Sequence, residues 1–490
     1  MPIKRPLLTL LLSLCVACSA SAASASLHGS KPNIIVVLTD DQGYGQLGCQ
    51  GHPWLATPHI DALRLESIAF EDFHMSPTCS PSRAALLTGN VPFKNGVTHT
   101  GGARSRLALS AVTLPEYLKQ AGYTSGIFGK WHLGLESAYQ PEARGFDEVF
   151  IHGSGGIGQP QDVPDNQYDD PIIRHNDRFV QTSGFCTDVF FSEALRWIHE
   201  NKDQPFFAYI STNAPHGPFI APQEKKAKFA ADGFKWNQQG YYGMIENIDD
   251  NVGRLMAQLK AWQLDANTLV IFMSDNGFVA AGAGAGKLGE RDGQVLRAYH
   301  AGLKGSKKSP HEGGTKVPAL FRWKGVLQEG VACQALTAHI DIVPTLVDLA
   351  GGKLPEAIDG RSLLPLLDNP DADWADRNLF FHIGRWPNGQ AEQSKYDTEA
   401  GFAVRNARYR LVNHTELYDI LQDPGETRNL AASKPEVLAR MRTAYDQWWD
   451  AVRPYLVNED MPKLGPNPFH SQYRQQLKQG GVSAWQAPQF

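Results

Sequence analysis

Two pairs of oxygen-bearing side chains each follow an apolar run in this sequence. Asp40 and Asp41 end the run NIIVVLTDD, and Asp275 and Asn276 follow TLVIFMS. One such pair alone is more often a helix cap or a turn than a metal site. Two pairs, each after a run typical of a buried strand, favour a metal site. Because every ligand atom would be oxygen, we expect calcium or magnesium rather than zinc.

A cysteine precedes a predicted helix in the segment TCSPSRAALLTG. Ser80-Pro81 has the form of a helix cap and first turn, and Gly89 that of a stop. Cys79 would then lie in the positive field of a helix N-terminus, where Arg83 can point back toward it. The pair is either a nucleophile held by a guanidinium or, more plainly, a buried cysteine and a surface arginine.

Two further apolar runs end in residues that can do chemistry. YTSGIFGKWH ends in Lys130 and His132, and PFFAYISTNAPH ends in His216. Such continuous apolar runs are typical of strands buried on both faces of a parallel sheet. Helical patterns alternate with them, including a capping box from Thr113 to Glu116. We therefore predict an α/β fold with a large, doubly wound, mostly parallel sheet flanked by helices. Its ligands should bind beyond the carboxyl ends of the strands.

The patterns divide the chain into four parts. Residues 1–22 have the basic start, apolar run and small-residue end of a signal peptide, and the run is too short to span a bilayer. Residues 31–370 carry the α/β pattern, and residues 376–457 predict a smaller C-terminal α+β subdomain with a short antiparallel sheet. Residues 458–490, rich in Pro, Gln and Gly, are expected to form a surface tail. The protein should be periplasmic or secreted, with a lipid anchor at Cys18 as the less favoured alternative.

Composition excludes some classes of function. The 490 residues carry a net charge of −5 without a long run of one sign, so no nucleic-acid partner is expected. The glycine-rich stretch AAGAGAGKLGERDG has Leu288 where a phosphate loop needs Ser or Thr, and we predict a plain loop. Cleavage would leave Cys49, Cys79, Cys186 and Cys333, whose spacing leaves any disulfide pairing open.

Taken together, these motifs resemble those of the type I sulfatases. CSPSRAALLTG resembles the first family signature, GYTSGIFGKWHLG the second, and KPNIIVVLTDDQGYGQLG the opening strand, although Gln46 replaces a frequent aspartate. NAPHGPF, FMSDNG and LKGSKKSPHEGGTKVPAL follow in the family's order, and the similarity runs from about Lys31 to Leu430. The resemblance implies an alkaline-phosphatase-like fold and an exported sulfuric ester hydrolase whose substrates are sulfated small molecules or polysaccharides.

The resemblance also implies how Cys79 is used. In these enzymes a separate maturase oxidises the matching cysteine to formylglycine (3-oxoalanine), whose hydrate attacks the sulfur of the ester. The second hydroxyl of the hydrate then allows sulfate to be expelled. The matching metal ligands, usually to calcium with magnesium as the alternative, are Asp40, Asp41, Asp275, Asn276 and position 79 itself.

The remaining roles are carried over position by position. Arg83 would hold the formylglycine, Lys130 would bridge it and the sulfate, and His132 would be the base. His216 and Lys307 would bind sulfate and assist the leaving oxygen. Lys307 is preferred to Lys304 and Lys308 because the family's lysine stands five residues before the glutamate of E-G-G, here Glu312. Residues that could line a sugar pocket are His99, Arg104, His175, His300 and Arg385.

Three alternatives stay open from the sequence. A phosphodiester or phosphonate monoester hydrolase of the same fold can share the formylglycine motif. An inactive, carbohydrate-binding homologue is less favoured, because every site position that can be checked holds a competent residue. Cys79 would also remain a thiol in a host without the maturase.

Overall fold

The computed structural model describes residues 27–279, 287–355, 357–387, 389–396, 401–459, 461 and 465–488. The predicted signal peptide, Cys18 and the first part of the glycine-rich stretch lie outside these residues. Within them, no helix is both long and apolar enough to cross a membrane. The described cysteines, Cys49, Cys79, Cys186 and Cys333, are all free thiols.

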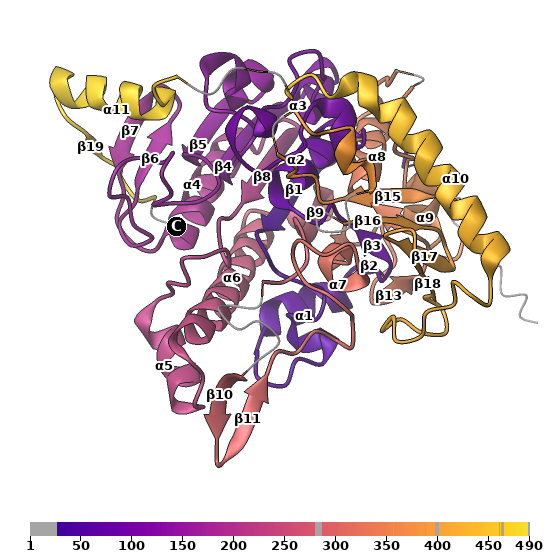
Figure 1. Cartoon of the computed structure of the whole chain (residues 1–490). Coiled ribbons are helices and arrows are strands. Elements are labelled where there is room, and N and C mark those ends of the chain that lie inside the picture. The colour runs from indigo at the N-terminus through magenta and orange to yellow at the C-terminus, as the bar shows by residue number, and fades with distance from the viewer. Residues whose placement is uncertain are drawn as a thin grey trace, which may run out of the picture.

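An 11-stranded sheet forms the centre of the molecule (Figure 1). From β9 through β1, β8 and β4 to β5, every neighbouring pair is parallel, and the flanking strands are mixed. This confirms the predicted doubly wound, mostly parallel sheet. The strands in spatial order are β13 (Val331–Cys333), β2 (Ile68–Phe70), β12 (Ala319–Arg322), β9 (Thr268–Ser274), β1 (Asn33–Thr39), β8 (Phe206–Ser211), β4 (Thr124–Lys130), β5 (Glu148–His152), β6 (Ile172–His175), β7 (Arg178–Gln181) and β19 (Ser483–Ala484).

Each face of the sheet is covered by helices and has its own apolar core. Along β1, Ile34 and Val36 enter one core and Ile35 and Val37 the other, as the two-residue repeat of a strand requires. The first core contains side chains of α2 (Cys79–Thr88), α3 (Leu114–Gln120) and α8 (Ile342–Leu349). The second contains those of α1 (Pro58–Leu65), α4 (Cys186–Asn201) and α6 (Trp236–Ala261). The predicted capping box is present at the start of α3, where Glu116 accepts the backbone N–H of Thr113 at 2.7 Å.

A second, smaller sheet confirms the predicted C-terminal architecture. Its four antiparallel strands are β15 (Leu379–His382), β16 (Phe402–Arg405), β17 (Tyr409–Val412) and β18 (Glu416–Asp419). Helix α10 (Pro435–Val452) runs beside this sheet in Figure 1 and buries Tyr445 and Trp449 against Phe402 and Leu411.

The C-terminal segment returns to the large sheet. It forms helix α11 (Pro468–Gln479) and strand β19, which pairs in parallel with β7 at the edge of the sheet. Figure 1 shows α11 beside β6 and β7, at the opposite end of the molecule from α10. Phe469 is buried with Phe179, and the indole N–H of Trp485 donates to Glu193 at 2.8 Å. The composition of residues 458–490 predicted a surface tail and did not indicate these two elements.

The remaining elements connect these layers. Part of the stretch predicted as a glycine-rich loop is instead a strand, β10 (Lys287–Arg291), which forms a hairpin with β11 (Gln294–Arg297) that projects from the molecule beyond α5 (Figure 1). The short elements are β3 (Phe73–His74), β14 (Thr337–Ala338), α5 (Gln223–Ala231), α7 (Glu312–Thr315) and α9 (Leu364–Asp368).

Candidate active site

The two predicted pairs of oxygen ligands lie side by side. Strands β1 and β9 are parallel neighbours with Thr39 opposite Ser274, so the residues that follow them meet at one sheet edge. The N–H of Asp41 donates to Asp275 Oδ1 at 3.2 Å, and Asn276 Nδ2 donates to Asp41 Oδ1 at 2.8 Å. All of these side chains are buried. Asp41 has a φ of 72°, so the chain turns sharply where the strand ends.

The site fits a bound cation. Asp40 Oδ1 and Asn276 Oδ1 are buried and have no hydrogen-bond partner among the described residues. Leaving such oxygens unsatisfied costs about 1–3 kcal/mol each, so they mark a place for a ligand. Ligand atoms of Asp40, Cys79 and Asp275 all lie within 4.8 Å of one another. The carboxylate and amide oxygens match the preference of calcium or magnesium.

Cys79 is the first residue of helix α2, one position after its N-cap Thr78. The Ser80-Pro81 motif predicted a cap two residues later than the N-cap in the structure. The predicted stop is present, because Gly89 has a φ of 69°. Cys79 is 2% exposed. Burial alone would raise the pKa of its thiol, but the nearby ammonium groups of Lys130 and Lys307 hold that pKa below its ordinary value.

Arg83 binds three of the strand ends from inside the pocket. Its Nε and Nη2 donate to Asp275 Oδ2 at 3.0 and 2.7 Å, and Nη1 donates to the carbonyl of Lys130 at 3.2 Å and to Ser211 Oγ. The side chain is fully buried. A guanidinium with several fixed N–H groups can make these contacts together, whereas a lysine cannot.

The Nδ1 atom of His132 faces Cys79, and a hydrogen bond at Nε2 fixes the tautomer of the ring. Its Nε2 lies 2.9 Å from the carbonyl oxygen of Thr100, and its Nδ1 lies 3.5 Å from Cys79 Sγ. A carbonyl only accepts, so Nε2 carries the proton of the neutral ring and Nδ1 is the free acceptor. Burial and the charge of Lys130 lower the pKa of His132 well below its ordinary value, which keeps the ring neutral. Nδ1 is therefore placed to take a proton from a group at position 79.

His216 and Lys307 complete the pocket beside Asp41. His216 follows β8, and its Nε2 lies 3.8 Å from Asp41 Oδ2, while burial lowers its pKa to about 4. Lys307 Nζ donates to Asp41 Oδ2 at 2.8 Å. Of the two other lysines considered, Lys304 pairs with Glu416 at 3.3 Å, outside the pocket. The structure thus places Lys307, the lysine preferred from the spacing, beside Asp41.

Positive and negative side chains balance in this pocket. Each of three carboxylates, Asp40, Asp41 and Asp275, pairs with a cation, namely Lys130, Lys307 and Arg83 respectively. With the Cys79 thiol neutral, the formal charges cancel. A divalent cation among the oxygens would leave the pocket positive, which favours an anionic substrate.

Three contacts of the site escaped the sequence analysis. Ser211 accepts from Arg83, Thr100 accepts from His132 through its carbonyl, and the hydroxyl of Tyr241 donates to the carbonyl of Asp41 at 2.9 Å. Ser211 ends β8, so its place at the sheet edge could have been inferred. Thr100 acts through its backbone, and Tyr241 lies within a long helix, so neither has a local signal.

The candidates for a sugar pocket separate into two groups. His175 pairs with Glu148 at 2.7 Å and Arg104 with Glu459 at 3.4 Å, so ion pairs account for both. Arg385 reaches the site, because its Nη2 donates to Thr100 Oγ1. The ring of His300 stacks on Phe278, two residues after Asn276. His99 has a buried Nδ1 without a hydrogen-bond partner in the described part of the chain.

Comparison with known proteins agrees with this geometry. The sulfatase family model matches residues 32–352, and a model of the C-terminal part of N-sulphoglucosamine sulphohydrolase matches residues 306–447. Human N-acetylgalactosamine-6-sulfatase is 32% identical over 86% of each chain. Human arylsulfatase A is 30% identical over 84% of this chain and 86% of its own.

A solved structure adds a relative with a bound carbohydrate. The crystal structure of Ps i-CgsB in complex with k-i-k-neocarrahexaose is 28% identical, with a TM-score of 0.71 over 88% of this chain and 98% of that chain. The match of the family model over most of the chain, together with these relatives, shows that the protein belongs to the sulfatase family, the sulfuric ester hydrolases of alkaline-phosphatase-like fold.

Proposed function

We propose that this protein is an exported sulfatase that hydrolyses sulfate esters of carbohydrates through a formylglycine made from Cys79 and a bound calcium or magnesium ion. One observation carries the proposal. The Cys79 side chain lies at the start of α2 between the free Nδ1 of His132 and the strand-end carboxylates Asp40 and Asp275. A nucleophile, a base and a hard-cation site therefore share one pocket.

The two groups that the pocket would hold supply chemistry that its own side chains lack. A hydrated formylglycine at position 79 supplies an oxygen nucleophile with a second hydroxyl, and the cation, held by Asp40, Asp41, Asp275 and Asn276, stabilises negative charge on sulfate oxygens. His132 Nδ1 accepts a proton from position 79. Arg83, fixed by Asp275, keeps that position oriented.

The cations around the pocket account for binding and departure of the ester. Lys130 and Lys307 pair with Asp40 and Asp41 respectively, and present positive charge to a sulfate that binds beside these carboxylates. His216, next to Asp41, is placed to assist the leaving oxygen. The ion pairs of Lys130 and Lys307 are buried or nearly so, and these two cations therefore need little reorganisation when the ester binds.

The carbohydrate substrate and the location rest on different observations. The names of two relatives refer to sugars, an N-acetylgalactosamine sulfate and a bound neocarrahexaose, which supports a sulfated carbohydrate. The signal-peptide pattern of residues 1–22 supports export to the periplasm or the medium. A maturase that reads the CSPSR segment is the implied partner.

The experiment combines mass spectrometry with kinetics. Protein made with a formylglycine-generating maturase should yield a peptide spanning residues 65–83 with the mass of the aldehyde in place of the thiol. The same protein should hydrolyse 4-nitrophenyl sulfate faster than bis(4-nitrophenyl) phosphate, with activity lost in chelator and restored by calcium or magnesium. Cys79→Ala is the matched control. Faster turnover of the phosphodiester, or full activity of an unmodified thiol, would contradict the proposal.

A further inference from the structure

Two cations that form no ion pair with any described residue lie at the edge of the catalytic pocket. Lys308 follows Lys307 directly, and its backbone N–H donates to the carbonyl of Pro77 at 2.9 Å, two residues before Cys79. Arg385 comes from the C-terminal subdomain, and its Nη2 donates to Thr100 Oγ1. No described carboxylate lies within ion-pair distance of either side chain. Arg385 is half-buried, whereas the side chain of Lys308 is exposed to solvent.

The chain is built to bring Arg385 close to the pocket. Gly384 has a φ of 67°, and a Cβ there would lie 2.0 Å from the carbonyl oxygen of Thr98. Only glycine permits this approach, which lets the Arg385 N–H donate to the same carbonyl at 3.0 Å. Thr100, which Arg385 contacts, also accepts from the catalytic His132. Arg385 is thus tied to the loop that orients the proposed base.

Both cations occupy a strained backbone conformation. Lys308 has a φ of 67° and Arg385 a φ of 65°. A non-glycine residue in this region costs on the order of 1 kcal/mol, and such strain gathers at functional sites. Arg385 Nε is moreover buried with no hydrogen-bond partner in the described part of the chain.

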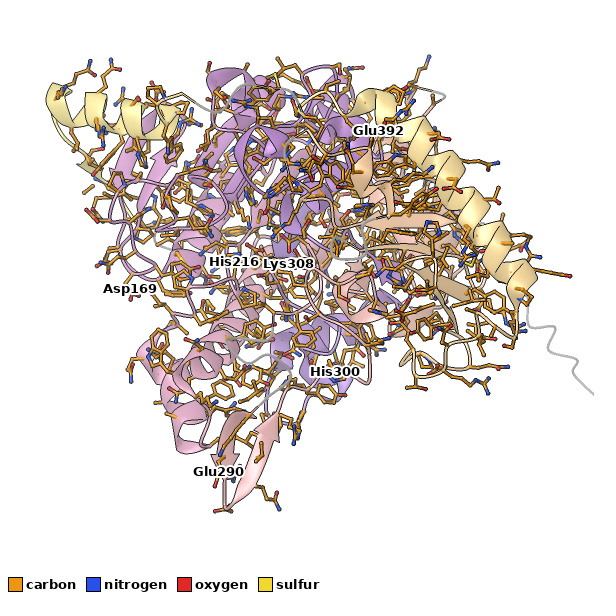
Figure 2. The ribbon with its side chains drawn as sticks, viewed as in Figure 1. Asp169, His216, Glu290, His300, Lys308 and Glu392 are labelled. Atoms are coloured by element: carbon orange, nitrogen blue, oxygen red, sulfur yellow. The ribbon has the colours of Figure 1, made fainter. Side chains whose placement is uncertain are left out.

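The two charges also act on each other. The Arg385 guanidinium is the main reason why the pKa of Lys308 lies below its ordinary value. Backbone contacts to Pro77 and Thr98 place the two residues beside the pocket, and neither has a carboxylate partner among the described residues, which leaves both charges for an anion. Lys304 provides the contrast, because it pairs with Glu416 outside the pocket. In the view of Figure 2, the labels of Lys308 and His216 lie next to each other in the middle of the molecule.

We propose that Lys308 and Arg385 form a second anion subsite, which binds either a second sulfate on the sugar that carries the ester being hydrolysed or the carboxylate of a neighbouring uronate. This inference rests on the proposed function and goes further by assigning the substrate class, a carbohydrate with at least two anionic groups. The net charge of −5 gives no long-range attraction for such polyanions, so a local pair of cations has to select them.

Calorimetry on the full chain tests the subsite separately from catalysis. The Cys79→Ala protein, in calcium, is titrated with N-acetylgalactosamine 6-sulfate, with the 4,6-disulfate, and with a disaccharide that joins a uronate to the 6-sulfated sugar. We expect one of the dianions to bind at least about tenfold more tightly than the monosulfate, on the scale of one charge-assisted hydrogen bond. Which dianion does so distinguishes the second sulfate from the carboxylate.

Substitutions of Lys308 and Arg385 test whether these two cations cause the tighter binding of the dianion. Arg385→Gln and Lys308→Gln should each bring the affinity ratio close to one, while Lys304→Gln should retain it. Lys308→Gln breaks no described ion pair, so it carries the test even if Arg385→Gln fails to fold. Equal binding of all three compounds, or a ratio that survives both substitutions, would overturn the subsite. Hydrolysis of 4-nitrophenyl sulfate by the matured wild-type protein tests the proposed function independently.

Discussion

Replacing Asn276 by aspartate should make folding depend much more strongly on calcium. Asn276 Nδ2 donates to Asp41 Oδ1 at 2.8 Å and to the carbonyl of Gly277 at 3.0 Å, while its Oδ1 is one of the buried oxygens without a partner in the described part of the chain. Asn276→Asp keeps an oxygen at that place but turns the donor into a second oxygen facing a carboxylate. Without a cation, the variant adds a negative charge to a pocket whose formal charges otherwise cancel.

The size of the effect follows from these contacts. A hydrogen bond to a charged group contributes about 1.5–3 kcal/mol, and the substitution removes it. Repulsion between two carboxylates at this separation adds several kcal/mol at an effective dielectric constant of about 20, although protonation of one of them limits the penalty. We expect the free energy of unfolding in chelator to fall by about 3–5 kcal/mol. A cation that binds only the folded state offsets the added charge, so in calcium the loss should shrink to about 1 kcal/mol.

Urea unfolding of wild type and Asn276→Asp, each in EGTA and in calcium chloride, measures this difference. Asn267→Asp is the matched control, because it adds the same charge at an exposed position after helix α6. The control should lose little stability in either condition. If calcium does not reduce the difference in unfolding free energy between wild type and Asn276→Asp, the oxygens at the ends of β1 and β9 do not bind a common ion.

Three further predictions concern activity, stability and pH. Arg83→Lys keeps the charge but cannot maintain both contacts to Asp275, so kcat/KM for 4-nitrophenyl sulfate should fall at least about 100-fold in a folded protein. Arg410→Met removes one of two arginines that contact the buried Glu312; because Arg405 stays paired with it at 3.0 Å, the free energy of unfolding in urea should fall by about 2–3 kcal/mol. Burial lowers the pKa of His339 to about 3, so its stabilising contribution is complete above about pH 6.5 and is lost as the pH falls toward 3. His339→Gln should therefore lose about 2 kcal/mol less stability than wild type between pH 7.5 and 5.

The sequence was sufficient to predict where the strand-end residues meet. Apolar runs that end in Asp40, Lys130, His216 and Asp275 belong to β1, β4, β8 and β9, and these strands are consecutive in the sheet. Parallel neighbours bring their carboxyl ends to one edge whatever their order along the chain. Local sequence patterns were enough to predict this arrangement. Each strand can be recognised from its own apolar composition, and parallel pairing in the sheet then brings the ends of the strands together.

Other features of the structure are not indicated by any local sequence pattern. The contact between Arg385 and Thr100 joins residues 285 positions apart and depends on how the C-terminal subdomain packs on the sheet. Strand β19 has only two residues, Ser483–Ala484, which is too short for an alternating pattern to be recognised. The start of α2 was misplaced because Ser80-Pro81 is a good cap in isolation, whereas the structure extends the helix back to Cys79.

The backbone conformation of four pocket residues explains why the sequence predicted which residues meet but did not predict how their side chains are oriented. Asp41, His132, Lys308 and Arg385 all have a φ above 60°. Each lies just beyond a strand or in a loop at the pocket, where a residue in the left-handed region turns the chain abruptly. Of these four types, only aspartate and histidine adopt this conformation with any frequency, so the sequence gives little sign of the turn. The strain persists because buried contacts on both sides hold it, as between Asp41, Asn276 and Lys307. The sheet therefore sets which residues meet, and the strained turns set which atoms of those residues face the substrate.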